Sequence, residues 1–203
     1  NDLKALIVGD RPILEDVSRL AENCFIIAAD GGANRLLSHG IRPDLVIGDM
    51  DSISSSSKRE LEDVLLEDKN INSTDLEKAF DYAKDQNATQ ITIIGWAGGR
   101  VDHTLAAFGL VFKGAILIDE VFHVEEIKEK FSFSSPEGTI FSLISVPTAV
   151  VSVSGSRWDL DQTTLNLGGR ALHNEVDSSG KVTITCHSGK LALMRGKFRL
   201  PHD

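Results

Sequence analysis

The chain has 203 residues, of which 41% are hydrophobic, and a formal net charge of −9 at pH 7. This length allows one or two domains with apolar cores, the negative charge argues against nucleic-acid binding, and no apolar run is long enough to cross a membrane. The two cysteines, Cys24 and Cys186, have neither disulfide-framework nor zinc-site spacing, which favours a reducing, cytoplasmic location.

The first part of the chain alternates short apolar runs with helical patterns. Five apolar runs are typical of strands buried on both faces of a parallel sheet: residues 5–8, 25–29, 45–47, 91–94 and 115–118. Five segments between and after them have helical periodicity: residues 12–22, 33–39, 57–66, 74–86 and 104–112. This alternation predicts an α/β domain with an open, mostly parallel sheet and flanking helices.

After residue 125 the hydrophobic pattern changes to a period of two. Apolar and polar residues alternate in four segments: residues 139–146, 149–153, 181–186 and 190–194. The last two are joined by His187-Ser188-Gly189, which predicts a hairpin. Residues 1–125 contain 12 Lys+Arg and 22 Asp+Glu, a net charge of −10, whereas residues 126–203 contain 9 and 8, a net charge of +1. We therefore expect an α/β domain over 1–125 and an all-β sandwich over 126–203.

Carboxylates and glycines directly follow several predicted strands. Asp30 and Gly31 follow the second strand, and Asp49 and Asp51 follow the third. The loop after the fourth strand contains a glycine pair, a cation, an acid and an imidazole: Gly98, Gly99, Arg100, Asp102 and His103. The carboxyl ends of parallel strands meet at one edge of an open sheet, where ligands bind, so we expect these residues to lie together.

The chemistry of this edge follows from its residue types. Carboxylates at one place repel one another unless a cation lies between them, and oxygen ligands without a Cys or His cluster favour Mg²⁺ over zinc. Glycines let backbone N–H groups approach phosphate, and Arg100 offers it a planar fork. Asp30, Asp102 and His103 adjoin predicted helix starts, where anions are favoured. One Asp at a strand end is more often a helix cap, so the prediction of Mg²⁺ and phosphate chemistry depends on three such loops coinciding.

Common nucleotide motifs are absent from the sequence. The first predicted turn, residues 8–12, reads VGDRP rather than GxGxxG, which argues against a dinucleotide cofactor. The chain has neither a P-loop motif nor a GxSxG nucleophile turn.

The same segments resemble the thiamin pyrophosphokinase family. Residues 30–34 (DGGAN) resemble its ADGGAN element, and residues 40–52 (GIRPDLVIGDMDS) resemble GIxPD followed by IGDxDS. Residues 73–79 (STDLEKA) resemble its TDxxxA helix start, and residues 95–103 (GWAGGRVDH) resemble GAxGGRxDH. Residues 157–160 (RWDL) with Asn174-Glu175 resemble its WxL and SNE stretch. The resemblance covers about residues 5–195.

The resemblance implies an ATP- and Mg²⁺-binding catalytic α/β domain, a thiamin-binding β-sandwich, and a homodimer with thiamin near its interface. It implies three metal ligands: Asp49, Asp51 and Asp75. Asp30 would also lie near Mg²⁺ and the phosphates, Arg100 and Asp102 would help to hold ATP, and Ser52 would be a neighbour. Trp158 would stack on thiamin close to Asn174, although a Trp in a small β domain is by itself more often a core residue.

The implied reaction is attack of the thiamin hydroxyl on the β-phosphorus of ATP with AMP as leaving group. Either Asp75 or Asp102 could accept the hydroxyl proton. The chain departs from the family pattern at four positions: Ile71, Asn72, Ala107 and His173. Two other functions stay open, namely diphosphate transfer to another alcohol such as a hydroxymethyl-pterin, and a non-catalytic nucleotide- or thiamin-binding module.

Overall fold

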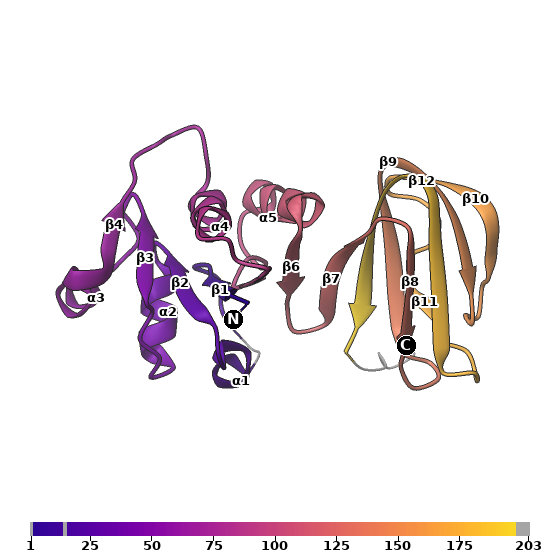
Figure 1. Ribbon diagram of the computed structural model, residues 1–203, viewed down its shortest axis with the longest axis horizontal. Helices are drawn as coiled ribbons and strands as arrows, with labels where there is room; N and C mark the ends of the chain where they lie inside the picture. Colours follow the sequence, from indigo (N-terminus) through magenta and orange to yellow (C-terminus); the bar gives the residue numbers. More distant parts are fainter. Residues whose placement is uncertain (1, 14–15, 198–203) are drawn as a thin grey trace. The chain divides into compact units, whose positions relative to one another are not determined.

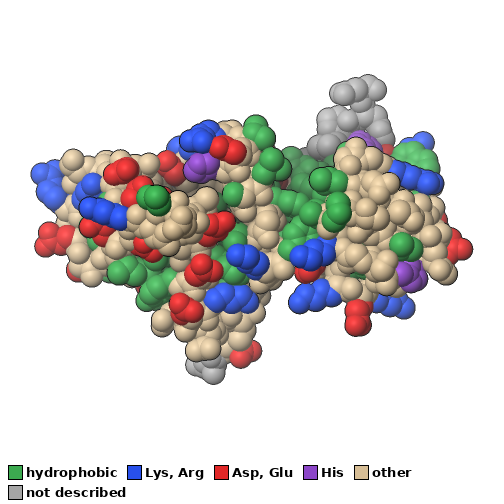
Figure 2. Space-filling view, turned by 90° about the horizontal axis from the view of Figure 1, so that it is seen from above, with side chains coloured by type: hydrophobic (Ala, Val, Ile, Leu, Met, Phe, Trp, Pro, Cys, Tyr) green, Lys and Arg blue, Asp and Glu red, His purple; other side chains and the backbone are tan. Residues whose placement is uncertain are grey.

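The computed structural model describes residues 2–13 and 16–197, and the chain divides into two compact units, Asn1–Glu120 and Val121–Asp203 (Figure 1). None of the helices in the described part of the chain combines the length and apolarity needed to span a membrane. On the face shown in Figure 2, acidic and basic side chains are interspersed rather than gathered by sign.

The first unit contains a parallel sheet. Its described strands are β1 (Lys4–Val8), β2 (Phe25–Ala29), β3 (Leu45–Gly48), β4 (Leu65–Glu67), β5 (Gln90–Ile94) and β6 (Ala115–Ile118). Within this unit their order is β6-β5-β1-β2-β3-β4, and every neighbouring pair is parallel. The chain thus moves outward from β1 through β4 and then returns to the other side of β1. The topological switch point lies between β1 and β5, which is where open α/β sheets bind ligands.

Helices cover both faces of this sheet. They are α1 (Val17–Ala21), α2 (Gly32–Ser38), α3 (Ser55–Glu60), α4 (Asp75–Asp85) and α5 (Val101–Gly109), with the 3₁₀ turns η1 (Glu62–Val64) and η2 (Leu110–Lys113). Right-handed crossovers place α1 and α2 on one face and α4 and α5 on the other (Figure 1). The start of α4 is fixed by a capping box, in which the Thr74 side chain accepts the Glu77 N–H and the Glu77 carboxylate accepts the Thr74 N–H.

Tight backbone contacts bring the strand ends together. A Cβ atom at Gly9 would lie 2.4 Å from the carbonyl oxygen of Gly95, and one at Gly32 would lie 1.9 Å from that of Val8. Glycine is therefore required where β1 meets β5 and where α2 begins. Behind this edge, fully buried side chains such as Leu6 and Leu36 contribute to an apolar core.

The second unit is all-β and is organised by two long strands. Its described strands are β7 (Phe122–Ile127), β8 (Lys130–Ser134), β9 (Ile140–Ser154), β10 (Leu160–Asn166), β11 (Asn174–Glu175) and β12 (Lys181–Gly196). β9 and β12 pair antiparallel. β12 also pairs with β8 and then β7, and β9 with β11 and then β10. Their inward side chains, including Phe141, Val151 and Ile184, form one buried core.

The predicted fold class, an open parallel α/β sheet followed by an all-β sandwich, is confirmed. The hairpin predicted at residues 187–189 is wrong, because β12 runs straight through it. Two register shifts absorb these residues while Ser188 and Gly189 stay paired with β9, and Gly189 has a φ of +83°. A bulge thus replaces the turn. The predicted strands 139–146 and 149–153 likewise form one strand, β9, which pairs with β12 on both sides of the register shifts.

Two predicted helices are shorter than expected. Residues 65 and 66 belong to β4, where Leu65 pairs with Val46 at the sheet edge. The expected helix 12–22 begins only at Val17, with Asp16 as its N-cap, and residues 14 and 15 lie outside the described residues.

Candidate active site

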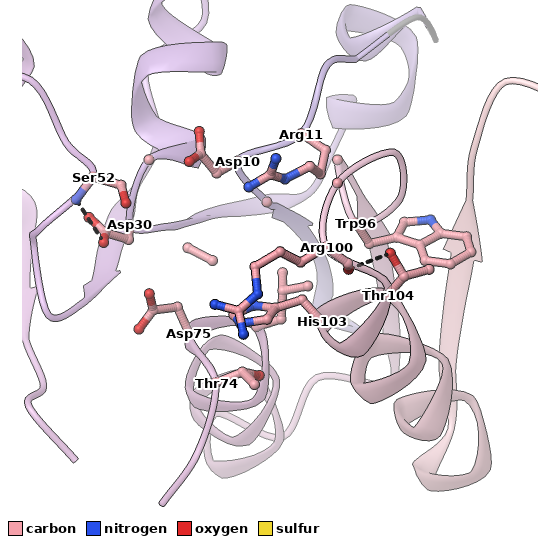
Figure 3. A pocket seen from close by; sticks show the side chains of 16 residues that line it. Asp10, Arg11, Asp30, Ser52, Thr74, Asp75, Trp96, Arg100, His103 and Thr104 are labelled. Atoms are coloured by element: carbon pink, nitrogen blue, oxygen red, sulfur yellow. Dashed lines mark hydrogen bonds between the residues drawn. The ribbon is translucent and has the colours of Figure 1, made fainter. Parts of the chain in front are cut away.

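A cavity of about 270 Å³ lies at the switch point of the first unit (Figure 3). The turn after β1 contributes Gly9, Asp10 and Arg11 to its lining, and the turn after β2 contributes Asp30 and Gly31. The remaining lining residues come from β2, from the loop after β3, from the start of α4, and from the β5–α5 loop with the first turn of α5: Ala29, Ser52, Thr74, Asp75, Leu76, Gly95, Trp96, Gly99, Arg100, His103 and Thr104. Most of the predicted strand-end residues therefore meet at one place.

Three carboxylates form a group at this edge. Asp30, Asp49 and Asp75 each present an oxygen atom within 4.8 Å of the others, close enough to hold one metal ion. Asp30 is only 4% exposed, and its Oδ2 accepts the Ser52 N–H at 3.1 Å. Its Oδ1 is buried and has no hydrogen-bond partner among the described residues. A buried, unpaired oxygen beside two other carboxylates fits a cation ligand.

Burial, hydrogen bonds and mutual repulsion change the pKa values of the three carboxyl groups. Burial raises the pKa of Asp30 to about 6, and the neighbouring charges of Asp49 and Asp75 add to the rise, while the Ser52 N–H opposes it. The pKa of Asp49 is lowered, mainly because its carboxylate accepts the Asp51 N–H and also pairs with Asp30. Burial raises the pKa of Asp75. Without a cation, Asp30 therefore keeps its proton up to about pH 6, and its ionisation at higher pH is unfavourable.

Lys78 lies beside the carboxylate group and is a residue that sequence reasoning missed. Its Nζ donates to Asp75 Oδ1 at 3.2 Å and to the Asp68 carbonyl at 2.7 Å. The side chain is 5% exposed. One ammonium group offsets only part of the charge of three carboxylates, so the site still favours an added cation.

Three predicted residues lie outside this arrangement. The Asp51 carboxylate is exposed and is not in the group of three; its backbone N–H instead holds Asp49 at 3.0 Å. Asp102 is exposed and binds Arg100 through two hydrogen bonds of 3.1 and 2.6 Å, which lower the pKa of Asp102. Gly98 does not line the cavity and has a φ of +94°.

A second cavity, of about 520 Å³, adjoins the first and shares Thr74, Asp75 and His103 with it. Asp49 and the loop that carries the departures Ile71 and Asn72 also line it. The Ile71 side chain is 95% exposed, and Asn72 is also exposed. Ala107, the third departure, is buried in α5.

The second unit presents an exposed tryptophan. Trp158 is 51% exposed, whereas Trp96 is 7% exposed and donates its Nε1–H to the Ile118 carbonyl at 3.0 Å. Asn174 is buried, and it accepts the Trp158 N–H at 3.3 Å and donates to the Trp158 carbonyl at 3.0 Å. The Arg157 guanidinium lies 4.6 Å from the centre of the Trp158 ring and covers one indole face.

His173, the fourth departure from the family pattern, lies next to Asn174. It is exposed, has a φ of +53°, and its Nε2 is 3.6 Å from Glu175 Oε1. It therefore changes the surface beside Asn174 and leaves the Asn174 hydrogen bonds in place.

Asp10 and Arg11 also line the cavity. They were not predicted as site residues, although their position in the sequence could have indicated them. They follow β1 directly, so the strand-end argument that found Asp30 and Asp49 applies to them equally. Their turn lacks a known nucleotide motif, so the sequence indicated no specific role for either residue.

Comparisons with known proteins agree with this geometry. Residues 17–118 match the sequence model described as thiamin pyrophosphokinase, catalytic domain, and residues 122–191 match that described as thiamin pyrophosphokinase, vitamin B1 binding domain. Thiamine pyrophosphokinase of Bacillus subtilis (strain 168) is 31% identical over 203 residues, covering 92% of this chain and 94% of that protein. Thiamine pyrophosphokinase 1 of Oryza sativa subsp. japonica is 26% identical over 214 residues, covering 87% and 79%. The crystal structure of thiamine pyrophosphokinase from Bacillus subtilis has a TM-score of 0.85 at 26% identity and covers 95% of this chain and 98% of that chain. The chain therefore belongs to the thiamin pyrophosphokinase family.

Proposed function

We propose that this chain transfers diphosphate from ATP to the hydroxyl group of thiamin, which gives thiamin diphosphate and AMP. The observation that carries the proposal is the switch-point cavity, where Arg11 and Arg100 reach in opposite the carboxylates of Asp30 and Asp75 (Figure 3). A site with carboxylates on one side and guanidinium groups on the other suits a polyphosphate and its cation. Membership of the thiamin pyrophosphokinase family supports thiamin as the alcohol that accepts the diphosphate.

The carboxylate group fits Mg²⁺. Its oxygen atoms lie within 4.8 Å of one another, the Asp30 Oδ1 has no partner among the described residues, and no His or Cys belongs to the group. Asp30, Asp49 and Asp75 would hold the ion, while Asp51 would act through its N–H on Asp49. When bound, the ion would offset negative charge on the phosphate oxygens.

The transfer forms one bond and breaks one. The hydroxyl oxygen bonds to the β-phosphorus, the bond from that phosphorus to the oxygen shared with the α-phosphate breaks, and AMP leaves with that oxygen. Of the two candidate proton acceptors, Asp75 lines the cavity. Asp102 is exposed, paired with Arg100 and has a lowered pKa. We therefore assign the proton to Asp75.

Trp158 would bind thiamin through its uncovered indole face, and an aromatic face attracts a cationic heterocycle. Asn174 would act indirectly. Its Oδ1 and Nδ2 are occupied by the backbone of Trp158, and Nδ2 also donates to the Ser156 Oγ at 3.2 Å. Asn174 thus holds the Trp158 loop in position.

We also propose that the protein is a cytoplasmic homodimer with thiamin near the subunit interface. Three large hydrophobic side chains of the second unit, Trp158, Leu167 and Leu172, are 51–60% exposed, and a partner subunit would cover such residues. Cys24 and Cys186 are free thiols, which supports the proposed cytoplasmic location. Light scattering after size exclusion would test the dimer, and a monomer at micromolar concentration would contradict it.

The activity is tested by mixing the protein with ATP, Mg²⁺ and thiamin and measuring AMP and thiamin diphosphate. Equal amounts of both products, lost with EDTA and in the Asp75→Asn variant, are expected. Thiamin binding without product would indicate the non-catalytic module instead. Product only with a hydroxymethyl-pterin would indicate the other alcohol.

A further inference from the structure

We propose that the guanidinium of Arg11 binds the polyphosphate chain of the nucleotide, and that position 99 is a glycine because the Arg11 side chain passes directly over it. This inference rests on the proposed function and adds a second phosphate-binding arginine to Arg100. Gly99 belongs to the family motif at residues 95–103, whereas Arg11 lies in the turn after β1, which none of the family motifs quoted above includes.

The Arg11 backbone is fixed against the β5–α5 loop. The Arg11 N–H donates to the Gly95 carbonyl at 3.0 Å, and the Gly9 N–H donates to the Ile94 carbonyl at 2.9 Å. These bonds tie the turn after β1 to the end of β5 on both sides of Asp10. The side chain of Arg11 therefore starts from a defined point at the rim of the cavity.

Gly99 provides the space for the rest of the side chain. A Cβ atom at position 99 would lie 2.5 Å from Nη1, 2.6 Å from Cζ and 2.7 Å from Cδ of Arg11. Gly99 is not among the glycines with positive φ, in contrast to Gly98. The φ angle at position 99 thus does not require glycine, but a side chain there would displace the Arg11 side chain from its present position.

Arg11 also differs from the other described cations around the cavity in having no counter-ion. Arg100 is bound by the Asp102 carboxylate, Lys78 by Asp75, and Arg35 lies 4.0 Å from Asp10. Among the described residues, the half-buried Arg11 guanidinium makes no hydrogen bond or ion pair. A partly buried guanidinium without a partner is unfavourable, and a phosphate group satisfies its planar fork with two hydrogen bonds.

Binding of polyphosphates without thiamin tests this role. The affinities of wild type and variants for ATP, inorganic triphosphate and AMP are measured by calorimetry in Mg²⁺. Arg11→Ala is expected to weaken ATP and triphosphate binding by roughly 10- to 100-fold, with a smaller effect on AMP. The ATP affinity of Arg11→Lys should lie between those of wild type and Arg11→Ala, because lysine keeps the positive charge and lacks the planar fork of the guanidinium. Arg59→Ala, at an exposed position on α3 outside both cavities, is the control.

The link between the two residues is tested by a double-mutant cycle. Gly99→Ala should weaken ATP binding about as much as Arg11→Ala, and the double variant should bind no more weakly than either. Multiplicative losses would refute the role of Gly99. If Gly99→Ala does not fold, as judged by thermal unfolding, the comparison of Arg11→Ala with Arg11→Lys decides the phosphate contact.

Wild-type affinity for ATP in the Arg11→Ala variant would overturn the proposal. Failure of the proposed function is a separate result, because it appears as absence of thiamin diphosphate from the wild-type protein. A wild-type protein that binds neither ATP nor triphosphate would overturn both.

Discussion

Replacement of Asp30 by Asn is expected to stabilise the metal-free protein at neutral pH and to remove its stabilisation by Mg²⁺. The pKa of Asp30 is raised from 3.8 to about 6, a difference of about two units that corresponds to about 3 kcal/mol once the carboxyl is ionised. Part of this cost is offset through Asp49, whose pKa is lowered first by the Asp51 N–H and then by its pairing with Asp30. We therefore expect a gain of about 1 to 3 kcal/mol.

The gain should depend on pH in a defined direction. The folded state binds the proton more tightly than the unfolded state, so wild-type stability contributed by Asp30 is present below pH 3.8 and is lost as pH rises through about 6. The advantage of Asn over Asp should therefore be near zero at pH 4 and full at pH 7.

The assay is urea unfolding of wild type and Asp30→Asn at pH 4 and pH 7, with EDTA or with Mg²⁺. Mg²⁺ should raise the free energy of unfolding of the wild type at pH 7 and leave that of the variant unchanged. Asp81→Asn, an exposed position on α4, is the control for charge alone. A variant that is less stable than wild type at pH 7 in EDTA, or that is still stabilised by Mg²⁺, would refute the reasoning.

Three further predictions concern other parts of the molecule. Gly32→Ala should cost more than about 3 kcal/mol of stability, because its Cβ would lie 1.9 Å from the Val8 carbonyl oxygen; urea unfolding measures this. The pKa of His123 is lowered to about 4, first by burial and then by Arg195. As pH falls, His123 is therefore protonated at a higher pH in the unfolded state than in the folded state, and stability should decrease between pH 6.5 and pH 4. With the side chain 25% exposed, we expect a loss of about 2 kcal/mol, which His123→Gln should abolish in unfolding at pH 7 and pH 5. Trp158→Ala should raise the KM for thiamin by roughly 10-fold or more and leave that for ATP unchanged in steady-state assays.

Two of these predictions have a matched control variant. Gly109→Ala meets nothing within 4 Å and should keep or increase stability, because Ala favours the helix; a similar effect of both glycine substitutions would contradict the steric argument. Trp158→Phe should retain part of the thiamin affinity. If His123→Gln keeps the full pH dependence, other groups must titrate in this range.

The sequence by itself determined the fold class and the edge of the sheet that holds the site. Runs such as residues 5–8 and 91–94 are largely apolar on both faces, and their alternation with helical segments indicates a parallel sheet covered by helices on both faces. Asp30 and Asp49 follow such runs directly, so their place at the carboxyl edge follows from local order along the chain.

The tertiary structure decided which neighbours in space those residues have. The family resemblance implied Asp49, Asp51 and Asp75 as metal ligands with Asp30 nearby. In the structure the carboxylate oxygens of Asp30, Asp49 and Asp75 lie closest to one another, because strand order and backbone turns determine where each carboxylate points. The bulges of β12 and the edge pairing of Leu65 likewise depend on distant strands. Arg11 and Gly99 are 88 positions apart in the chain and meet only because β1 and β5 are adjacent, a contact that no local pattern encodes.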